Sequence, residues 1–597
     1  GRYSPKFDAE ILRHMRPTLS ELGEYDGTAL MEFKTKKEII YRINRETVCT
    51  YEMDDTPPFM IDEEALDIAL EVGLLYDCKM IDELHIARKQ YLDGSIPAGF
   101  QRTTIVGVDG KIPYLGRDIR IVQLGLEEDA CREVSDVGHR RVYLTDRLGM
   151  PLIETVTAPD MRTPQEVADV AQILRRLVRS TGMMRTGIGA AREDVNVSVT
   201  GGTRVEIKGV PRIPRIPRLT YYEAMRQWNL LRLKDELASR GVVTETFAAS
   251  AEEITKVLRR ALYQPLQSAV AAGMTVHGVR LGGFKGLLRW QTQTDTVFSR
   301  EISDRVRVIA CLTVLPNIAH SDSFGETLAS SEWTAVRKAL GAGPNDTMVV
   351  VWGPDADGKL GAQEIIARAR EATIGVPSET RQAFGDGTNG FERILPGPDR
   401  MYPDTDLPPK LIPPERLERV RASLPPHILT REGRYRELGV PEDLVARLVA
   451  SPFAPLFEQA VGEWGVKPAL AAVVLVQYPR RLKRRGLPVD RLDAATIEAV
   501  LRALGGRRLY KEGVLPLLER VLSAGGTVSE ALPPVADAEG VIAGIRGATA
   551  VVKGLRFRRE PARALKAMGF LMASLRGRAD GAELAARLDG ALQGAAE

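Results

Sequence analysis

Two short stretches, 195–199 and 204–208, constrain the fold more than any other feature of this sequence. Valine occupies every second position of the first stretch, and in the second Val205 and Ile207 alternate with charged residues. A period of two predicts strands that bury one face only. The glycine pair at 201–202 supplies the turn between them, so the sequence predicts a β-hairpin.

The register of this hairpin follows from keeping its apolar and polar faces separate. A three-residue loop, Thr200–Gly202, pairs Val197 with Val205 and Val195 with Ile207. A two-residue loop would mix the faces, whereas a five-residue loop also separates them, so the loop length stays open. The other face is either part of a charged site or a solvated ladder whose ion pairs each contribute about 0.2–1 kcal/mol. Its predicted cross-strand neighbours are Ser198 with Arg204, Asn196 with Glu206, and Asp194 with Lys208.

Acidic residues follow short apolar runs upstream of the hairpin. Glu127, Glu128 and Asp129 follow Leu126, and Glu154 ends the run 151–153. Carboxylates are the ligands that Mg²⁺ prefers, and a charged strand face beside them could hold polyphosphate. The alternative for each single acid is an ordinary position in a surface loop.

Composition places the chain in a broad class. Its 597 residues, of which 44% are hydrophobic and 27% charged, predict several globular domains with apolar cores. A net charge of +3 does not select a partner, so a nucleic-acid surface would have to come from local patches. The four cysteines form no CxxC pair, which disfavours zinc and disulfides and predicts a reducing, cytoplasmic location.

Several ordered motifs between residues 88 and 208 are similar to those of a known family. Together they resemble the B/E family of kinase and transamidase subunits of tRNA-dependent amidotransferases. Ordered motifs over such a length are far more specific than a lone glycine motif. They are Leu126–Ala130, Arg147–Glu154, Pro159–Arg162, Arg192–Ser198 and Arg204–Lys208, preceded by Arg88–Tyr91, Asp93–Ser95 and Gly99–Thr103.

The resemblance implies a two-step reaction that uses ATP and Mg²⁺. ATP would phosphorylate the γ-carboxyl of glutamate carried on tRNA(Gln), and ammonia would then displace phosphate to give Gln-tRNA(Gln). Glu127 and Glu154 are implied as metal ligands, and with Lys208 as catalytic residues, with Glu128 behind them. The residues implied to bind the nucleotide are Arg88, Lys89, Arg192, Asp194, Asn196, Glu206 and Lys208.

One family motif is not found. The family begins with a Gly-Leu-Glu-Ile-His string whose Glu and His join the metal site, and this sequence starts downstream of such a string. We therefore expect that the residues given cannot complete a four-ligand metal site.

The resemblance also implies an α+β multidomain fold. A cradle-shaped β-sheet core would be interrupted by an α+β domain similar to that inserted in bacterial-type aspartyl-tRNA synthetases, and helical and tail domains would follow. The insertion, with a buried strand at Met348–Trp352 between helical stretches at 330–340 and 362–372, favours the archaeal E branch of the family. The predicted ranges are 1–274 and 386–415 for the cradle, 275–385 for the insertion, 416–505 for the helical domain and 506–597 for the tail.

Helical periodicity predicts amphipathic helices at Glu63–Leu75 and at 164–181. The three prolines of Pro211–Arg218 predict an extended segment, which is either an exposed linker or a track for nucleic-acid phosphate. A helix that carries Tyr221 and Trp228 is expected to follow it.

From Pro414 onward the sequence predicts helices that carry two basic clusters. Such clusters are either solvated faces or contacts to a phosphate backbone, and two of them in helical modules fit tRNA. The predicted tRNA-binding residues are Arg480, Arg481, Lys483, Arg484, Arg485, Lys553, Arg556, Arg558 and Arg559.

No nucleophile for releasing ammonia stands out, because the six histidines are scattered. The resemblance therefore implies an asparaginase-like amidohydrolase, the D subunit of such enzymes, as partner, and a homodimer of this chain within a heterotetramer. The main alternative is a tRNA-binding accessory protein without catalytic activity. A tRNA synthetase is disfavoured, because the sequence contains neither a HIGH/KMSKS pair nor a convincing class II core.

Overall fold

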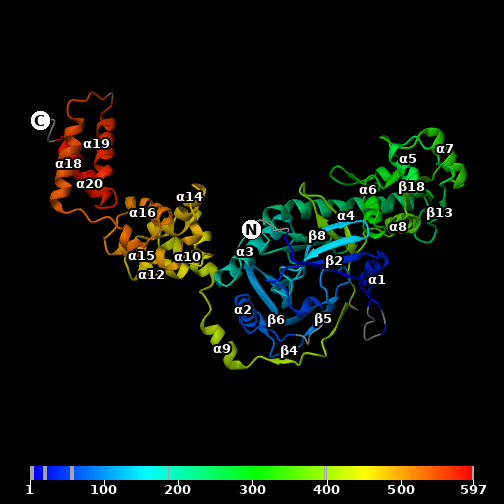
Figure 1. The fold of residues 1–597 in the computed structure, drawn as a ribbon, viewed down its shortest axis with the longest axis horizontal. Coiled ribbons are helices and arrows are strands. Elements are labelled where there is room, and N and C mark those ends of the chain that lie inside the picture. The colour runs from blue at the N-terminus through cyan, green and yellow to red at the C-terminus, as the bar shows by residue number, and fades with distance from the viewer. Residues whose placement is uncertain are drawn as a thin grey trace. The chain divides into compact units, whose positions relative to one another are not determined.

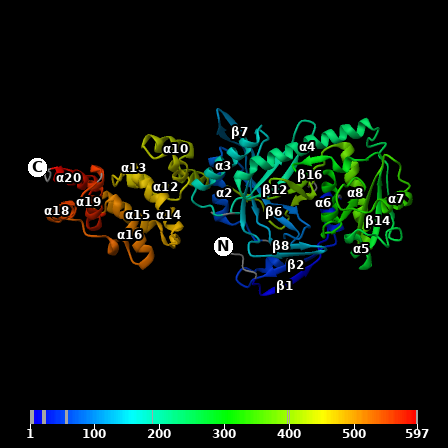
Figure 2. The ribbon, with the colours of Figure 1, turned by 90° about the horizontal axis from the view of Figure 1, so that it is seen from above.

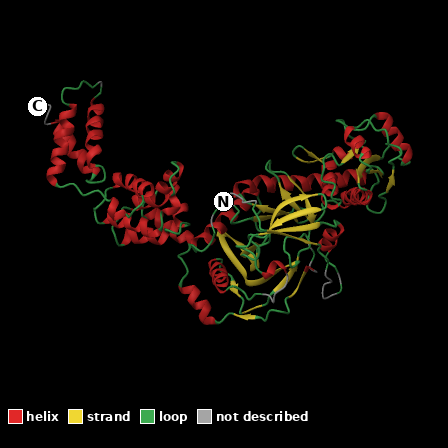
Figure 3. Ribbon diagram, in the orientation of Figure 1, coloured by secondary structure: helices red, strands yellow, loops and turns green. Residues whose placement is uncertain are grey.

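The computed structural model divides the chain into two compact units (Figure 1). Unit 1 comprises Gly1–Arg175 and Arg185–Ser423, and unit 2 comprises Arg176–Met184 and Leu424–Glu597. Unit 1 mixes strands and helices, whereas unit 2 is helical, so the predicted mixed multidomain class is confirmed (Figure 3). The residues described are 6–17, 23, 25–53, 59–185, 187, 189–395, 397, 400–557 and 559–593.

The largest sheet of unit 1 is built around one long hairpin. Its strand order is β10-β7-β6-β5-β21, and β6 and β7 meet at a turn where Leu115 and Gly116 have φ of 44° and 78°. Helix α2 (Glu63–Leu75), as predicted, begins at Asp62, whose carboxylate accepts the Ala65 N–H at 2.8 Å. The strands are β5 (Ala87–Gln90), β6 (Phe100–Tyr114), β7 (Arg117–Glu128), β10 (Pro151–Thr157) and β21 (Met401–Pro403), and β3 (Lys79–Met80) also pairs with β6.

A second sheet of unit 1 has the order β1-β2-β9-β8. Tyr41 and Tyr143 are buried in its core, with their ring centroids 6.1 Å apart. The elements are β1 (Ala9–Arg13), β2 (Glu38–Ile43), β8 (Arg132–Val137) and β9 (Arg140–Leu144), with α1 (Gly27–Lys34), η1 (Thr50–Met53), α9 (Pro414–Ala422) and the β4 (Glu83–Leu84)–β22 (Lys410–Leu411) pair elsewhere in the unit.

The predicted hairpin forms β11 (Glu193–Val197) and β12 (Val205–Val210) of a third sheet, which β19 (Glu379–Ala383) and β20 (Asn389–Ile394) complete. The pairs Val195–Ile207, Asn196–Glu206 and Val197–Val205 are confirmed. Two details are corrected. The strands end before the predicted Ser198–Arg204 pair, and a register shift between Glu193 and Val195 removes Asp194 from its predicted place opposite Lys208.

The hairpin turn is wider than predicted because a helix binds its backbone. Gln227, on α4 (Ile216–Ser239), accepts the Val199 N–H at 3.2 Å and donates to the Val197 carbonyl at 3.0 Å. Residues 198–204 form the loop, across which the Gly202 N–H donates to the Val199 carbonyl at 2.9 Å.

The prediction of an extended segment at Pro211–Arg218 is wrong. Residues Ile213–Arg215 form the 3₁₀ turn η2, and α4 begins at Ile216. Two of the prolines lie in the first turns of these elements, where a missing N–H has no partner to lose. The helix with Tyr221 and Trp228 is confirmed as α4. It is the long helix of unit 1 in both Figure 1 and Figure 2.

A fourth sheet of unit 1, ordered β13-β14-β18-β17, contains the predicted buried strand. Every residue of β18 (Thr347–Gly353) is buried, because helices cover the sheet. The sheet also includes β13, which lies before residue 275, the predicted first residue of the insertion. The predicted division of the chain into five ranges stays a prediction. The other elements are β13 (Ala249–Glu253), α5 (Gln264–Ala271), β14 (Thr275–Leu281), η3 (Leu287–Arg289), β15 (Gln291–Gln293), β16 (Thr296–Val297), α6 (Phe298–Ile309), β17 (Ile318–His320), α7 (Ser330–Ala339) and α8 (Asp355–Ile374).

Unit 2 is helical throughout its described residues, as predicted. Its last three helices share one core around Leu571 and Leu588. No helix in the described part of either unit has the length and apolar character needed to cross a membrane. The helices are α10 (Ile428–Glu437), α11 (Glu442–Val449), α12 (Ala454–Gly462), α13 (Pro468–Ala472), η5 (Val473–Gln477), α14 (Tyr478–Arg484), η6 (Val489–Arg491), α15 (Ala494–Gly505), α16 (Lys511–Ala524), α17 (Val528–Ala531), α18 (Ala538–Val552), α19 (Glu560–Leu575) and α20 (Gly581–Gln593), and the end of α3 (Pro164–Ser180) joins them.

Candidate functional site

Four neighbouring strands place a lysine, a threonine and two carboxylates on one face of the largest sheet. Thr103 on β6 lies opposite Glu127 on β7. On the other side of β7, Glu154 lies two positions along β10 from the residue opposite Glu127, so it faces the same side of the sheet as Glu127. Lys89 Nζ donates to Glu127 Oε1 at 2.7 Å, and the Thr103 hydroxyl donates to the same oxygen at 3.1 Å. The predicted acids Glu127 and Glu154 are therefore brought together, with Lys89 beside them.

The Glu127 carboxylate affects the protonation of Glu154. Desolvation, together with the negative charge of Glu127, which hydrogen-bonds with Glu154, raises the pKa of Glu154 to about 7, although the positive charge of Lys89 acts to lower it. Burial would lower the pKa of Lys89, but the charges of Glu127, Tyr91 and Glu154 outweigh that effect and raise it. Because the one positive charge of the Lys89 ammonium group does not balance two carboxylates, the pair can accommodate an additional cation.

Replacing Glu127 with glutamine is expected to lower the pKa of Glu154 from about 7 toward its usual 4.5, because a neighbouring negative charge is lost. The value should stay above 4.5, since partial burial remains. Carbon-13 NMR titration of the Glu154 carboxyl measures this directly. Thr103→Val removes a hydrogen bond but no charge and serves as the control. A Glu154 pKa that stays near 7 in Glu127→Gln would contradict the coupling.

The charged face of the hairpin sheet interacts electrostatically with this acid pair. The Asp194 charge contributes to the raised pKa of Glu154, and Asp194 accepts the Gly209 N–H at 2.8 Å. Lys208 Nζ lies 3.9 Å from Glu206 Oε1, and Asn196 is exposed opposite Glu206. The apolar side of the hairpin is buried against α4, so its polar side is the one available to a ligand.

Glu392 on β20 is a site residue that the sequence did not reveal. Burial raises the pKa of its carboxyl, while Lys208 acts to lower it and Asp194 to raise it. Glu392 lies where the β19–β20 register shifts, which leaves it without a direct cross-strand neighbour. No motif surrounds it in the sequence. The strand that pairs with β20, β19, follows β12 by about 170 residues, so no local pattern brings Glu392 to the hairpin.

Three predicted residues have other partners. Glu128 faces the opposite side of β7 from Glu127, and its carboxylate accepts from Arg102 Nε at 3.1 Å. Arg88 is paired with Asp404 at 3.0 Å on the side of β5 away from Lys89. Arg192 donates to Asp129 at 3.0 Å. The structure therefore does not bring these three side chains into contact with the acid pair.

Glu127 and Glu154 could hold a metal ion only together with ligands of another kind. Within the described ranges, no group of three His, Cys, Asp or Glu side chains lies close enough to bind a metal. Two neighbouring carboxylates nevertheless fit Mg²⁺, which usually keeps several waters and takes further oxygens from substrate phosphates.

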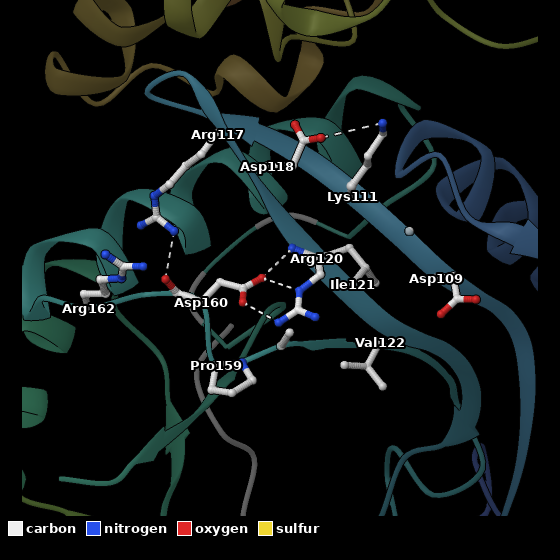
Figure 4. Close-up of a pocket in the computed structure, with 12 residues that line it drawn as sticks. Asp109, Lys111, Arg117, Asp118, Arg120, Ile121, Val122, Pro159, Asp160 and Arg162 are labelled. Carbon is white, nitrogen blue, oxygen red and sulfur yellow. Dashed lines mark hydrogen bonds and ion pairs between the residues drawn. The ribbon is translucent and has the colours of Figure 1, made fainter. Parts of the chain in front are cut away.

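A cavity of about 620 Å³ lies elsewhere on unit 1, at the outer end of the β6–β7 hairpin (Figure 4). The carboxylate of Asp160 accepts from Arg120 Nη2 at 2.7 Å, and the Asp160 carbonyl accepts from Arg117 at 2.8 Å. These arginines are thus occupied by the motif Pro159–Arg162, which also lines the cavity. None of the predicted catalytic or nucleotide-binding residues lines this cavity, so it is not the candidate site.

The predicted tRNA-binding residues of unit 2 are solvent-exposed wherever they are described. Arg480, Arg481, Lys483 and Arg484 belong to α14, and Arg485, just after it, forms an ion pair with Glu519. Lys553, Arg556 and Arg559 are exposed between α18 and α19. Arg558 lies outside the described residues. The exposure of the described residues permits contact with phosphate.

Comparisons with known proteins match most of the chain. A family model described as the GatB/GatE catalytic domain matches residues 32–418. The chain is 36% identical, over 96% of its length and 92% of the relative's, to the E subunit of glutamyl-tRNA(Gln) amidotransferase from Methanocaldococcus jannaschii. The proteins of that name from Methanopyrus kandleri and Saccharolobus solfataricus are 37% and 33% identical, over 86% and 96% of this chain and 80% and 92% of their own lengths.

Proposed function

This chain belongs to the GatB/GatE family, and from that premise we propose that it is the ATP-dependent kinase and transamidase subunit that converts Glu-tRNA(Gln) to Gln-tRNA(Gln). The observation that carries the proposal is the coupled pair Glu127 and Glu154, with Lys89 beside it and the charged face of the hairpin sheet next to it. A protein that only bound tRNA would have no use for two carboxylates held at such an electrostatic cost.

In the first step, an oxygen of the glutamate γ-carboxylate attacks the γ-phosphorus of ATP. The bond from that phosphorus to the β–γ bridging oxygen breaks, ADP leaves, and a γ-glutamyl phosphate on tRNA forms. Such a transfer depends mainly on positioning and charge neutralisation. Lys89 beside Glu127 and Lys208 on the hairpin would supply positive charge, and Asn196 can donate hydrogen bonds to phosphate oxygens.

Glu127 and Glu154 would hold Mg²⁺, which would neutralise charge on the nucleotide phosphates when bound. Asp194 and Glu206 on the hairpin, with Glu392 beside them, would orient the nucleotide and Lys208. Arg192, directly before β11, is paired with Asp129. Arg88 is not included, because Asp404 and Asp406 already neutralise it.

In the second step, ammonia attacks the acyl carbon of the intermediate. The carbon–oxygen bond to phosphate breaks, phosphate leaves, and the nitrogen loses one proton to give the amide. Glutamine hydrolysis would be the task of a partner, an asparaginase-like amidohydrolase, in a heterotetramer that contains two copies of this chain. Unit 1 would then correspond to the cradle and its synthetase-like insertion, and unit 2 would bind tRNA through its basic clusters.

The isolated chain is expected to form Gln-tRNA(Gln) with ammonium chloride but not with glutamine as nitrogen donor, because no amidohydrolase nucleophile stands out in its sequence. Labelled Glu-tRNA(Gln), ATP and Mg²⁺ with either donor, followed by separation of the deacylated amino acids, measures this. Glutamine-dependent product from the pure chain would contradict the assignment of glutamine hydrolysis to a partner.

A further inference from the structure

The outer face of α4 carries an unusual set of exposed side chains. From the start of this helix to residue 232, its exposed residues are Arg218, Tyr221, Met225, Trp228 and Arg232. Tyr221 is 52% and Trp228 56% exposed, although aromatic rings of this size are normally covered. The spacing of three and four residues aligns all five along one side of the helix, over roughly 20 Å.

A second set of arginine and aromatic side chains continues from the end of this row. Arg232 lies over the Trp290 ring at 5.6 Å, and the Trp290 Nε1–H donates to the Asn229 carbonyl at 2.9 Å. Arg289, the residue directly before Trp290, has its guanidinium carbon 3.4 Å from the centre of the Phe324 ring. Phe324 is 83% exposed. We call the seven residues Arg218, Tyr221, Trp228, Arg232, Trp290, Arg289 and Phe324 the aromatic track.

We propose that the aromatic track binds a single-stranded segment of the RNA substrate, with bases stacked on its rings and phosphates contacting its arginines. This proposal rests on the proposed function, which makes an RNA the substrate. Alternating rings and guanidinium groups are the surface to which unpaired bases bind without sequence preference. Arginine also retains its charge while it stacks on a ring, so both functions are available at one position.

The charge pattern favours RNA over a protein as the ligand. Tyr, Trp, Met and Arg are also enriched in protein interfaces, so composition alone does not decide. Up to Arg232, however, the exposed residues of this helix face include two arginines and no carboxylate, and Asp235, the next exposed residue of the face, lies beyond the track. The carboxylate of Asp322, near Phe324 in sequence, accepts from the Leu288 N–H and the Thr347 hydroxyl, both within 3.2 Å. That carboxylate is therefore held within the fold.

The track is distinct from the groups proposed for the chemistry. The opposite face of α4 packs on the apolar side of the hairpin through Ile216 and Leu219, whereas the charged residues lie on the hairpin's other side. Substitutions in the track should therefore change RNA affinity and leave the rate at saturating RNA unchanged.

The test compares wild type, Trp228→Ala, Phe324→Ala and the double variant, each as the full chain. Phe33→Ala, at an exposed phenylalanine of α1 in unit 1, is the matched control. Fluorescence anisotropy measures the Kd for unacylated tRNA(Gln), for a short single-stranded RNA and for the duplex of that RNA. Steady-state kinetics with Glu-tRNA(Gln) and ammonium chloride then separates KM from kcat.

The expected result is a Kd for tRNA and for single-stranded RNA about tenfold higher in the double variant. Phe33→Ala should bind as wild type does, the affinity for duplex should be the same in every variant, and the double variant should show a raised KM with unchanged kcat. Arg232→Gln should also reduce the slope of log K against log salt by about one unit.

Wild-type affinity for both RNAs in the double variant would overturn the proposal. If that variant also failed to assemble with a partner protein, the track would be a protein interface instead. If wild type forms no product but the double variant still loses RNA affinity, the proposed function fails while the RNA site stands.

Discussion

Replacing Glu154 with glutamine is expected to lower the rate of tRNA-dependent ATP cleavage by about 10²–10³-fold, the usual cost of losing one group that stabilises charge at a reacting centre. Glutamine keeps the size of the side chain but cannot supply the negative charge that, with Glu127, would attract Mg²⁺. The Mg²⁺ concentration needed for half-maximal rate should rise as well. Rapid-quench measurement of ADP formation at several Mg²⁺ concentrations checks both effects.

The pH dependence gives this prediction a second readout. Because the pKa of Glu154 is raised to about 7, the carboxylate is protonated below that pH and loses its affinity for a cation. The wild-type rate at limiting Mg²⁺ should therefore fall as pH decreases through 7, and the Glu154→Gln rate should be flat there. Glu252→Gln, the same change at an exposed residue of β13, is the control. A wild-type rate of ATP cleavage in Glu154→Gln would contradict the placement of Glu154 in the catalytic site.

Replacing Arg226 with methionine is expected to destabilise unit 1 by about 3–5 kcal/mol, since three buried carboxylates lose the cation they share, while Arg368 and Arg381 remain beside them. Arg226 is fully buried on α4 and donates to Glu301 at 2.6 and 2.8 Å and to Glu223 at 3.0 Å. It also bonds Glu379 of β19, the strand that pairs with β12. The network thus joins α4 and α6 to the sheet that carries Lys208.

Denaturant unfolding at pH 7 and pH 5 measures this loss. Burial would raise the pKa of Glu301, but Arg226 and Arg381 outweigh it and hold the pKa well below its usual value. In wild type this pairing stabilises the fold above about pH 4.5, and the contribution decreases as pH falls further. In Arg226→Met the deficit should be smaller at pH 5, where the unpaired carboxylates can take up protons. Lys359→Met, which removes an exposed pair with Asp355, should cost under about 1 kcal/mol. An equal cost for both variants would contradict the network.

Local pattern was sufficient to predict the elements whose stability depends on nearby residues. The period of two at 195–197 and 205–207 predicted the central register of the hairpin, and helical spacing predicted α2 with its bounds at Glu63 and Leu75. The actual environment of Asp194 and Lys208 could not be predicted in this way. It depends on a register shift and on the Gly209 N–H that binds Asp194.

Residues distant in the sequence account for most of what the sequence did not reveal. Glu392 reaches Lys208 only because β19 pairs with β12 and β20 with β19. The prolines at 214 and 217 suggested an extended chain, because their neighbours alone do not show that each stands in the first turn of a helix. The resemblance placed Glu127 and Glu154 in one site, but their coupling through a shared hydrogen bond came from the register of three strands.

The central claim is that Glu127, Glu154 and Lys208 belong to one site that phosphorylates Glu-tRNA(Gln). A single-turnover reaction of labelled ATP, Mg²⁺, Glu-tRNA(Gln) and ammonia tests it, with wild type compared to Glu154→Ala and Lys208→Ala. The account predicts ATP cleavage that requires Glu-tRNA(Gln) and is lost in both variants. Wild-type protein that binds tRNA but leaves ATP intact would contradict it, and repeating the reaction with a chain that carries the upstream Gly-Leu-Glu-Ile-His segment would then separate a missing metal ligand from a tRNA-binding accessory protein.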